Sequence, residues 1–240
     1  MRRFLPLLFL GLLSGPALAA PCPPAGVRLP PIPALAAALE RGSLTIVALG
    51  SSSTEGAGAS AAGLGYPTLL EERLRVAWPG VTVRVVNAGR SGETSSEMLA
   101  RMERDVLAER PDLVIWQAGG NEALRGREAG EFAAVMREGL DRLREAGVPV
   151  VLMDNQASPR LAARGPVFDA ELARLGAPVF RRSAAMRAWA ERGEDALIAS
   201  DALHHNDRGY ACLAGELSAA LRGAAGDAWQ RRAIAAQRRP

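Results

Sequence analysis

The chain has 240 residues, of which 48% are hydrophobic and 23% are charged, a balance that indicates one soluble globular domain and excludes a disordered or collagen-like chain. All 29 basic residues are arginine, against 26 acidic residues, so the formal net charge is +3. The lack of lysine excludes a phosphate-binding-loop lysine and Schiff-base chemistry. Six arginines lie in the first three or the last ten residues, and the remaining body is mildly acidic. We therefore expect no nucleic acid among the partners.

The first 20 residues have the pattern of an export signal. Two arginines at positions 2 and 3 form a charged start, an apolar run spans 4–13, and an Ala-x-Ala cleavage site lies at 17–19. The apolar run is shorter than the ~20 residues that span a bilayer. We expect a signal peptide over 1–20, a periplasmic or secreted protein, and no stable membrane span after cleavage. An uncleaved anchor is the alternative.

Two cysteines follow the signal, Cys22 and Cys212. An oxidising compartment permits a disulfide between them. Buried free cysteine is also common, so the sequence leaves both states open.

The rest of the chain divides into three parts. A proline-rich segment with a short helix is expected at 21–42, because its prolines favour extended backbone. The domain proper is expected at 43–223, and an arginine-rich C-terminal tail at 224–240. We find no internal repeat and no second domain.

Five short apolar runs in the domain predict buried strands. Apolar residues between them recur at helical spacing, for example Leu70 with Leu74. Parallel neighbours need crossover connections, so strands that alternate with helices predict a parallel sheet. The expected fold class is α/β: a three-layer α/β/α sandwich around a doubly wound, five-stranded parallel sheet. The predicted strands lie at about 44–49, 81–87, 112–117, 148–153 and 178–181.

The spacing of Thr94 and Glu97 predicts a capping box, and Asn206 is a good N-cap for the last helix. In a doubly wound sheet the ligand lies beyond the carboxyl ends of the strands. We therefore expect the loops that follow the first four strands to meet in space. These loops lie at 50–56, 88–93, 118–123 and 154–160.

Polar residues that could carry chemistry lie in three of these loops and before the last helix. Alone, each serine- or glycine-rich loop is typical of a turn. Together they supply a nucleophile candidate, exposed backbone N–H groups, a side-chain amide and an Asp/His pair, which is the set that acyl transfer requires. The segments are Gly50-Ser51-Ser52-Ser53, Asn87-Ala88-Gly89, Gly119-Gly120-Asn121 and Asp201-Ala202-Leu203-His204-His205.

A serine hydroxyl is a weak nucleophile until a base takes its proton, and histidine is the natural base. The chain has two histidines, His204 and His205. Asp201 stands three residues before His204, where it could orient that ring and stabilise its charged form. We expect His204 to be the base and His205 to be a bystander or a substrate-side contact.

The negative charge of a tetrahedral intermediate needs hydrogen-bond donors that are already in place. The candidates are the backbone N–H groups of Ser52 and Gly89 and the side-chain amide of Asn121. Glycine at position 89 would let a substrate approach the backbone closely. We expect neither a metal nor another cofactor.

These four segments, in this order, resemble the motifs of the SGNH hydrolase superfamily, the GDSL-type esterases and lipases, over about residues 44–222. The resemblance implies a flavodoxin-like three-layer fold, in agreement with the strand pattern. It also implies a catalytic triad and an oxyanion hole. The triad would be Ser52, His204 and Asp201, and the oxyanion donors Ser52, Gly89 and Asn121.

The sequence departs from the family pattern at three positions. The usual aspartate before the nucleophile is Ser51, the aspartate after the oxyanion asparagine is Glu122, and the residue after the catalytic histidine, often proline, is His205. None of these changes removes a catalytic atom. The run of serines leaves Ser51 and Ser53 as competing nucleophiles.

The expected function is an exported serine esterase that hydrolyses carboxylic esters, acyl or acetyl, through an acyl-enzyme. Its substrate would be a small-molecule, glycan or lipid ester, and the oligomeric state is open. The glycines of 56–61 approximate a dinucleotide fingerprint, but they lie beyond the first strand and open no clear helix. The alternative from another class is a catalytically silent carbohydrate-binding or interaction module, since fold alone does not fix chemistry.

Overall fold

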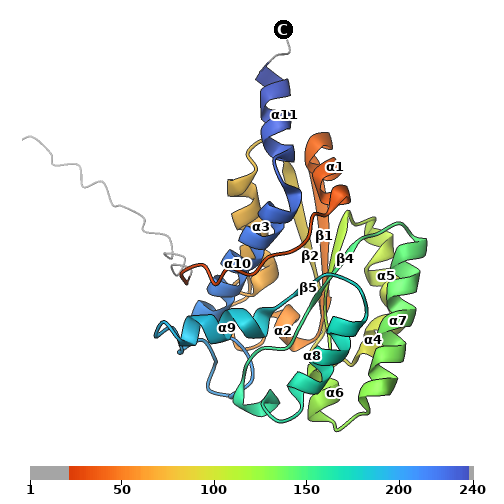
Figure 1. The fold of residues 1–240 in the computed structure, drawn as a ribbon, viewed down its shortest axis with the longest axis vertical. Coiled ribbons are helices and arrows are strands. Elements are labelled where there is room, and N and C mark those ends of the chain that lie inside the picture. The colour runs from red at the N-terminus through yellow and green to blue at the C-terminus, as the bar shows by residue number, and fades with distance from the viewer. Residues whose placement is uncertain (1–21, 238–240) are drawn as a thin grey trace, which may run out of the picture.

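A parallel sheet forms the centre of the computed structural model, which describes residues 22–237 (Figure 1). Its five strands lie in the order β2-β1-β3-β4-β5, and each neighbouring pair is parallel. The predicted fold class and sheet are therefore confirmed. The expected signal peptide lies outside the described residues. The strands are β1 (Ser43–Gly50), β2 (Thr82–Gly89), β3 (Leu113–Gln117), β4 (Val150–Met153) and β5 (Val179–Phe180).

The apolar runs of the strands supply two cores, one on each face of the sheet. In β1, Ile46 and Ala48 belong to one core, whereas Val47 and Leu49 belong to the other. Successive side chains of a strand point to opposite faces, so a strand buried on both faces is apolar at every position. This is why β3 and β4 show no alternation of polar and apolar residues, whereas the edge strand β2 has exposed polar positions.

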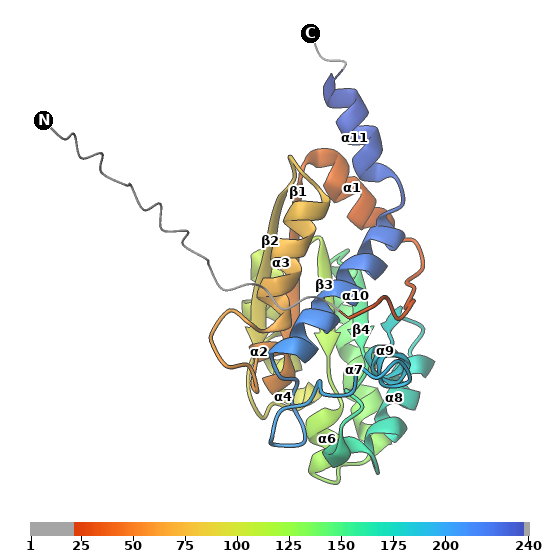
Figure 2. The same ribbon diagram turned by 90° about the vertical axis from the view of Figure 1, so that its left-hand side faces the viewer.

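Helices cover both faces of the sheet, as Figures 1 and 2 show. Most helical residues of the core that includes Ile46 come from three helices, and most of those of the core that includes Val47 come from four. The first set is α1 (Pro33–Arg41), α3 (Tyr66–Ala77) and α10 (Asp207–Ala225). The second set is α4 (Ser95–Ala100), α5 (Met102–Asp105), α7 (Ala129–Glu145) and α8 (Gly165–Arg174).

The remaining helical elements lie at the ends of strands or at the edge of the sheet. They are α2 (Ser52–Glu55), α6 (Gly120–Leu124), α9 (Arg182–Ala190) and α11 (Ala228–Gln237), with single 3₁₀ turns at Leu107–Glu109 and Pro159–Leu161. Within residues 22–237 no helix has both the length and the apolar character needed to cross a bilayer.

Two helix caps lie where the sequence predicts them. The backbone N–H of Thr94 donates to the Glu97 carboxylate at 2.7 Å and closes the capping box of α4. The side chain of Asn206 accepts the N–H of Gly209 at 2.9 Å at the start of α10. Both caps satisfy backbone donors that the first turn of a helix leaves unpaired.

The structure describes the expected arginine-rich tail as far as Gln237. Helix α10 continues to Ala225, and α11 packs beside α1 (Figure 1). The guanidinium of Arg231 pairs with the Glu40 carboxylate at 3.0 Å, and the indole of Trp229 donates to the Pro79 carbonyl at 3.1 Å. The described part of the tail is therefore helical.

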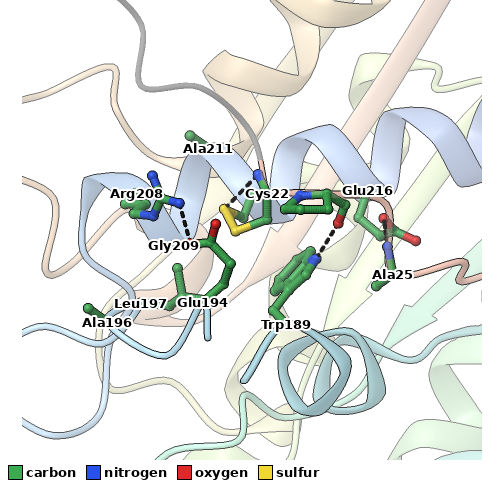
Figure 3. Close-up of a disulfide and its surroundings, with 12 residues drawn as sticks. Cys22, Ala25, Trp189, Glu194, Ala196, Leu197, Arg208, Gly209, Ala211 and Glu216 are labelled. Atoms are coloured by element: carbon green, nitrogen blue, oxygen red, sulfur yellow. Dashed lines mark hydrogen bonds and ion pairs between the residues drawn. A yellow bond between two sulfur atoms is a disulfide. The ribbon is translucent and has the colours of Figure 1, made fainter. Parts of the chain in front are cut away.

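The N-terminal segment is held to α10 by a disulfide and by backbone hydrogen bonds (Figure 3). Cys22 and Cys212 are bridged, with their Cα atoms 4.8 Å apart. The N–H groups of Ala25 and Val27 donate to the Glu216 carboxylate at 2.8 and 2.7 Å. The structure thus selects the bridged state from the two that the sequence leaves open.

We predict that the purified, oxidised protein shows no free thiol after denaturation and that its melting temperature falls on reduction. The bridge joins residues separated by 190 positions, and in the chain-entropy model a loop of that size contributes about 5 kcal/mol. Thiol titration in denaturant and thermal melts with and without reductant are the measurements. Two titratable thiols in the oxidised protein would contradict the prediction.

Candidate active site

Four loops meet at the carboxyl edge of the sheet, as expected for a doubly wound fold. Figure 2 shows α2, α4 and α6 gathered at this lower end of the molecule. The loop after β2 contacts α2 through Ser91, whose N–H donates to the Glu55 carboxylate at 2.9 Å. The loop after β3 contacts the loop after β2 through Asn121, whose amide donates to the Glu93 carbonyl at 2.7 Å.

A chain of hydrogen bonds joins the predicted triad residues at this edge. The hydroxyl of Ser52 lies 2.7 Å from Nε2 of His204. On the other side of the ring, Nδ1 of His204 lies 2.5 Å from Oδ2 of Asp201. Ser52 and His204 are 152 residues apart in the sequence, so only the fold brings them together.

The turn from Asp201 to His204 is compact and carries an unusual backbone conformation. Ala202 has φ of 59°, in the left-handed region that residues with a Cβ seldom adopt. Oδ1 of Asp201 accepts the N–H groups of Leu203 and His204, both at 2.9 Å. These two bonds hold the carboxylate while its other oxygen meets the ring.

The hydroxyl groups of the three consecutive serines have three different partners. Ser51 donates to the Gln117 side chain at 3.1 Å, and Ser53 donates to the Gln156 side chain at 3.3 Å. Ser52 alone of the three meets His204. The geometry therefore distinguishes the three serines, which the sequence could not do.

Asp201 has a strongly acidic side chain. Partial burial raises the pKa of Asp201, but hydrogen bonds from the His204 ring and from the N–H groups of Leu203 and His204 outweigh it and hold the pKa at about 2. An ionised carboxylate favours an imidazole with its proton on Nδ1, which leaves Nε2 free to accept a proton from Ser52.

His205 lies in a different environment, directly below the site. Its ring is fully buried, with Nδ1 at 3.3 Å from the Leu197 carbonyl and the ring packed edge-on against Tyr210 at 5.4 Å. Burial, together with the nearby charge of Arg182, lowers the pKa of His205 to about 3. His205 is therefore a neutral core residue, and in the described residues its ring has no hydrogen bond to a serine of the turn.

The predicted oxyanion donors are in three different states. The N–H of Ser52 has no acceptor among the hydrogen bonds of residues 22–237. The Asn121 amide uses one N–H for the Glu93 carbonyl, and its second N–H remains available. The N–H of Gly89, in contrast, donates to Oδ1 of Asn87 at 2.9 Å.

Gly89 also lies against α2 rather than beside an open space. A Cβ placed on Gly89 would come 2.2 Å from the backbone nitrogen of Glu55, so glycine is needed there for packing. Gly92 lies next to Glu93, which is bonded to Asn121, and has φ of 81°. Its carbonyl accepts from Arg125 at 2.6 Å, and within the described residues its N–H has no acceptor.

Two charged residues brace the loops that hold these donors. Glu122, which departs from the family aspartate, is buried, and its carboxylate accepts the N–H of Ser95 at the start of α4. The guanidinium of Arg101 is also buried and donates to the carbonyls of Gly50 and Ala88 at 3.3 and 2.7 Å. Arg101 thereby ties the ends of β1 and β2 together.

Sequence reasoning missed the two glutamines of the site. Gln117 ends β3 and accepts from the backbone N–H and the hydroxyl of Ser51, both at 3.1 Å. Gln156, in the loop after β4, donates to the Leu203 carbonyl at 3.0 Å. A polar residue at the end of an otherwise apolar strand was the signal that could have identified Gln117.

A buried cation lies below the same loops. Arg182 is fully buried at the start of α9, and two of its nitrogens donate to the Asp154 carbonyl at 3.0 and 2.7 Å. Burial raises the pKa of the Asp154 carboxyl to about 6, while hydrogen bonds from Ser183 oppose that shift. In the part of the chain that the structure describes, no group of His, Cys, Asp and Glu side chains has the arrangement of a metal site.

The sequence matches the Non-GDSL lipase-like family over residues 20–227. The chain belongs to this family. The matched range includes Ser52, Asp201 and His204.

Curated relatives of the chain are named as esterases. It is 36% identical over 100 residues to an esterase TesA of Pseudomonas aeruginosa, across 42% of this chain and 49% of that protein. It is 38% identical over 82 residues to an acetylxylan esterase of Geobacillus stearothermophilus, across 34% and 37% of the two chains. The alignments thus span half or less of the relatives' own length.

Solved structures share the fold. A two-domain esterase active on acetylated mannans superimposes with a TM-score of 0.66 and 26% identity, over 78% of this chain and 51% of that one. A structure of TesA superimposes with a TM-score of 0.60 and 25% identity, over 74% and 98% of the two chains. The flavodoxin-like architecture expected from the resemblance is therefore confirmed.

We predict that His205→Asn flattens the pH dependence of stability between pH 7 and pH 5. Between its unfolded pKa near 6.5 and its folded pKa of about 3, His205 binds a proton in the unfolded chain only, so the free energy of unfolding of the wild type falls as the pH falls. The variant should lose about 2 kcal/mol less than the wild type over this interval. Asparagine keeps a donor for the Leu197 carbonyl.

Urea unfolding of both proteins at the two pH values measures this difference. A general loss of stability in the variant cancels, because only the change with pH is compared, and the titration of Asp154 is common to both. Equal pH dependence in the two proteins would show that His205 is not held neutral.

Proposed function

We propose that the protein is an exported serine esterase that hydrolyses carboxylic esters. The observation that carries the proposal is the unbroken chain of hydrogen bonds from Ser52 through His204 to Asp201. Nucleophile, base and orienting carboxylate in this order are what acyl transfer at a serine requires. The esterase names of the relatives agree with this chemistry.

In the proposed reaction, Oγ of Ser52 attacks the ester carbonyl carbon while Nε2 of His204 takes the hydroxyl proton. The tetrahedral intermediate collapses when His204 returns that proton to the leaving alcohol oxygen, which leaves an acyl-serine. Water then attacks the acyl carbon, His204 again takes and returns a proton, and the carboxylic acid is released. Asp201 stays ionised throughout, since its pKa is about 2, and stabilises the imidazolium.

The proposed oxyanion donors are the N–H of Ser52 and the second N–H of the Asn121 amide. The prediction that Gly89 is a third donor requires its bond to Asn87 to break first. Gly92 has an N–H without an acceptor in the described residues and lies one residue from the partner of Asn121. We therefore propose Gly92 in place of Gly89.

The proposed substrates are short acyl or acetyl esters of a small molecule, a glycan or a lipid. Two relatives are named for acetylated polysaccharides, an acetylxylan esterase and an esterase active on acetylated mannans. Export is proposed from the pattern of residues 1–20. The disulfide between Cys22 and Cys212 supports it, because such bridges persist in oxidising compartments.

We predict that Ser52→Ala abolishes hydrolysis of p-nitrophenyl acetate, whereas Ser51→Ala and Ser53→Ala retain most of it. Only Ser52 meets the base, and loss of a triad nucleophile costs on the order of 10⁶ in turnover in related chemistry. An organophosphonate should inactivate the wild type and label Ser52. Initial rates and mass spectrometry of the labelled peptide are the measurements.

Two outcomes would overturn parts of this proposal. Equal losses at all three serines would remove the assignment of Ser52. A correctly folded wild type that neither turns over any short-chain or acetylated ester nor reacts with the phosphonate would favour the silent binding module instead.

We predict that Asn121→Ala lowers kcat by roughly 10² to 10³ with little change in KM, because it removes one donor to the charge that develops in the transition state. The control is Asn87→Ala, which removes the acceptor of the Gly89 N–H and should leave kcat near that of the wild type. A change confined to KM would make Asn121 a residue that binds the ground state.

A further inference from the structure

Gln156 connects the two segments that must meet for the proposed reaction. Its side chain is 5% exposed and lies in the loop after β4. Oε1 accepts the hydroxyl of Ser53 at 3.3 Å, and Nε2 donates to the carbonyl of Leu203 at 3.0 Å. Ser53 directly follows Ser52, and Leu203 directly precedes His204.

The loop that carries His204 is therefore held by hydrogen bonds at both the backbone N–H and the carbonyl of Leu203. The N–H of Leu203 donates to Asp201 at 2.9 Å, and its carbonyl accepts from Gln156. Leu203 thus links the orienting carboxylate of the triad to Gln156. A shift of this residue would move the His204 ring relative to Ser52.

We call the two hydrogen bonds of Gln156, to Ser53 and to Leu203, the glutamine bridge. The loop that carries Gln156 is itself held by hydrogen bonds on both sides of this residue. Before Gln156, the carbonyl of Asp154 accepts two bonds from the buried Arg182, and the N–H of Asn155 donates to Asp169 at 2.9 Å. After it, the N–H of Ala157 points to the sulfur of Met186 at 3.3 Å. Neighbours that are fixed on both sides leave Gln156 little freedom to move.

The amide of Gln156 serves its two partners in opposite roles. It donates to the Leu203 carbonyl, which can only accept, and it accepts from the Ser53 hydroxyl. Only asparagine and glutamine carry both a carbonyl oxygen and an NH₂ group on one side chain. A carboxylate of the same shape would face the Leu203 carbonyl with a second acceptor.

We propose that Gln156 is a positioning residue that holds the turn of Ser52 and the loop of His204 at reacting distance. The proposal rests on the proposed esterase function, and Gln156 acts through Ser53 and Leu203 without touching the substrate. Small displacements of catalytic groups cost up to about 10²-fold in rate. Loss of the two Gln156 hydrogen bonds should therefore lower kcat and leave KM nearly unchanged.

The experiment compares Gln156→Met and Gln156→Glu with the wild type on p-nitrophenyl acetate. We expect kcat to fall by about 10- to 100-fold in both variants, with KM within about twofold of the wild type. The Met variant keeps the length of the side chain and loses both bonds. The Glu variant keeps the acceptor for Ser53 and loses the donor to Leu203.

The matched control is Glu216→Met, which also removes two hydrogen bonds of a buried side chain, but these are part-buried bonds to Ala25 and Val27 of the N-terminal segment. We expect its melting temperature to fall as for Gln156→Met, with kcat unchanged. If kcat of the Gln156 variants equals that of the wild type, or falls only in step with stability as in the control, the proposal is overturned. A rise in KM at constant kcat would also overturn it.

A double-mutant cycle that combines Gln156→Met with Ser53→Ala tests whether Gln156 acts through its hydrogen bond to Ser53. The Ser53→Ala variant keeps the bond to Leu203 and should lose less rate than Gln156→Met. The double variant should be no slower than Gln156→Met alone, because the bond to Ser53 is already absent there. Additive losses would show that the two residues act separately.

A readout that needs no substrate separates this proposal from the proposed function. In the wild type, the proton between Nδ1 of His204 and Asp201 should give a downfield NMR signal, and Gln156→Met should broaden it through exchange with water. If the wild type hydrolyses no ester, the function fails while this signal still tests the bridge. Identical signals in the two proteins would overturn the positioning role.

Discussion

The parallel direction of all five strands is the constraint on which the site depends. Parallel strands end at the same edge of the sheet, so the loops after β1, β2, β3 and β4 lie side by side although the chain visits them far apart. The strand order also places β1 between β2 and β3. The turn that follows β1 therefore has a neighbouring loop on each side, and Ser52 can be surrounded by residues from both.

Near this edge of the sheet lie three buried side chains that can carry charge, Arg182, His205 and Asp154, and the charge of Arg182 affects the pKa of the other two. Arg182 is a buried cation, and desolvation lowers its pKa. The same positive charge disfavours a second one at His205 and counters the raised pKa of Asp154. Burial, reinforced by this guanidinium, thus keeps the core histidine neutral, while His204 in the same turn lies beside a carboxylate. Adjacent histidines have different environments for this reason.

The fold could be predicted from the sequence because burial on both faces makes the central strands apolar at most positions, and such apolar runs can be recognised from the local sequence alone. The termini of the strands were harder to place, since β5 is a single pair of residues, Val179 and Phe180, where the sequence suggests a longer run. The packing of α11 could not be predicted, because it depends on contacts with Glu40 and Pro79, which no local pattern contains.

The candidate site was predicted in part. The pairing of Asp201 with His204 follows from local spacing, but which serine meets the ring depends on the orientation of a turn, and Ser51 and Ser53 differ from Ser52 only in their partners. Gly89 was predicted to let a substrate approach the backbone, but the atoms that lie closest to it are those of Glu55 in α2. Contacts between distant loops, such as Gln156 with Leu203, are invisible to sequence spacing.

The disulfide has a consequence for the order in which the molecule is assembled. Synthesis runs from the N-terminus, so Cys22 is made early and its partner appears 190 positions later, after every strand of the sheet has been made. The bridge can therefore close only when the residues of all five strands have been made. It then fixes Cys22, the first residue that the structure describes, onto the helix that begins just after His204 and His205.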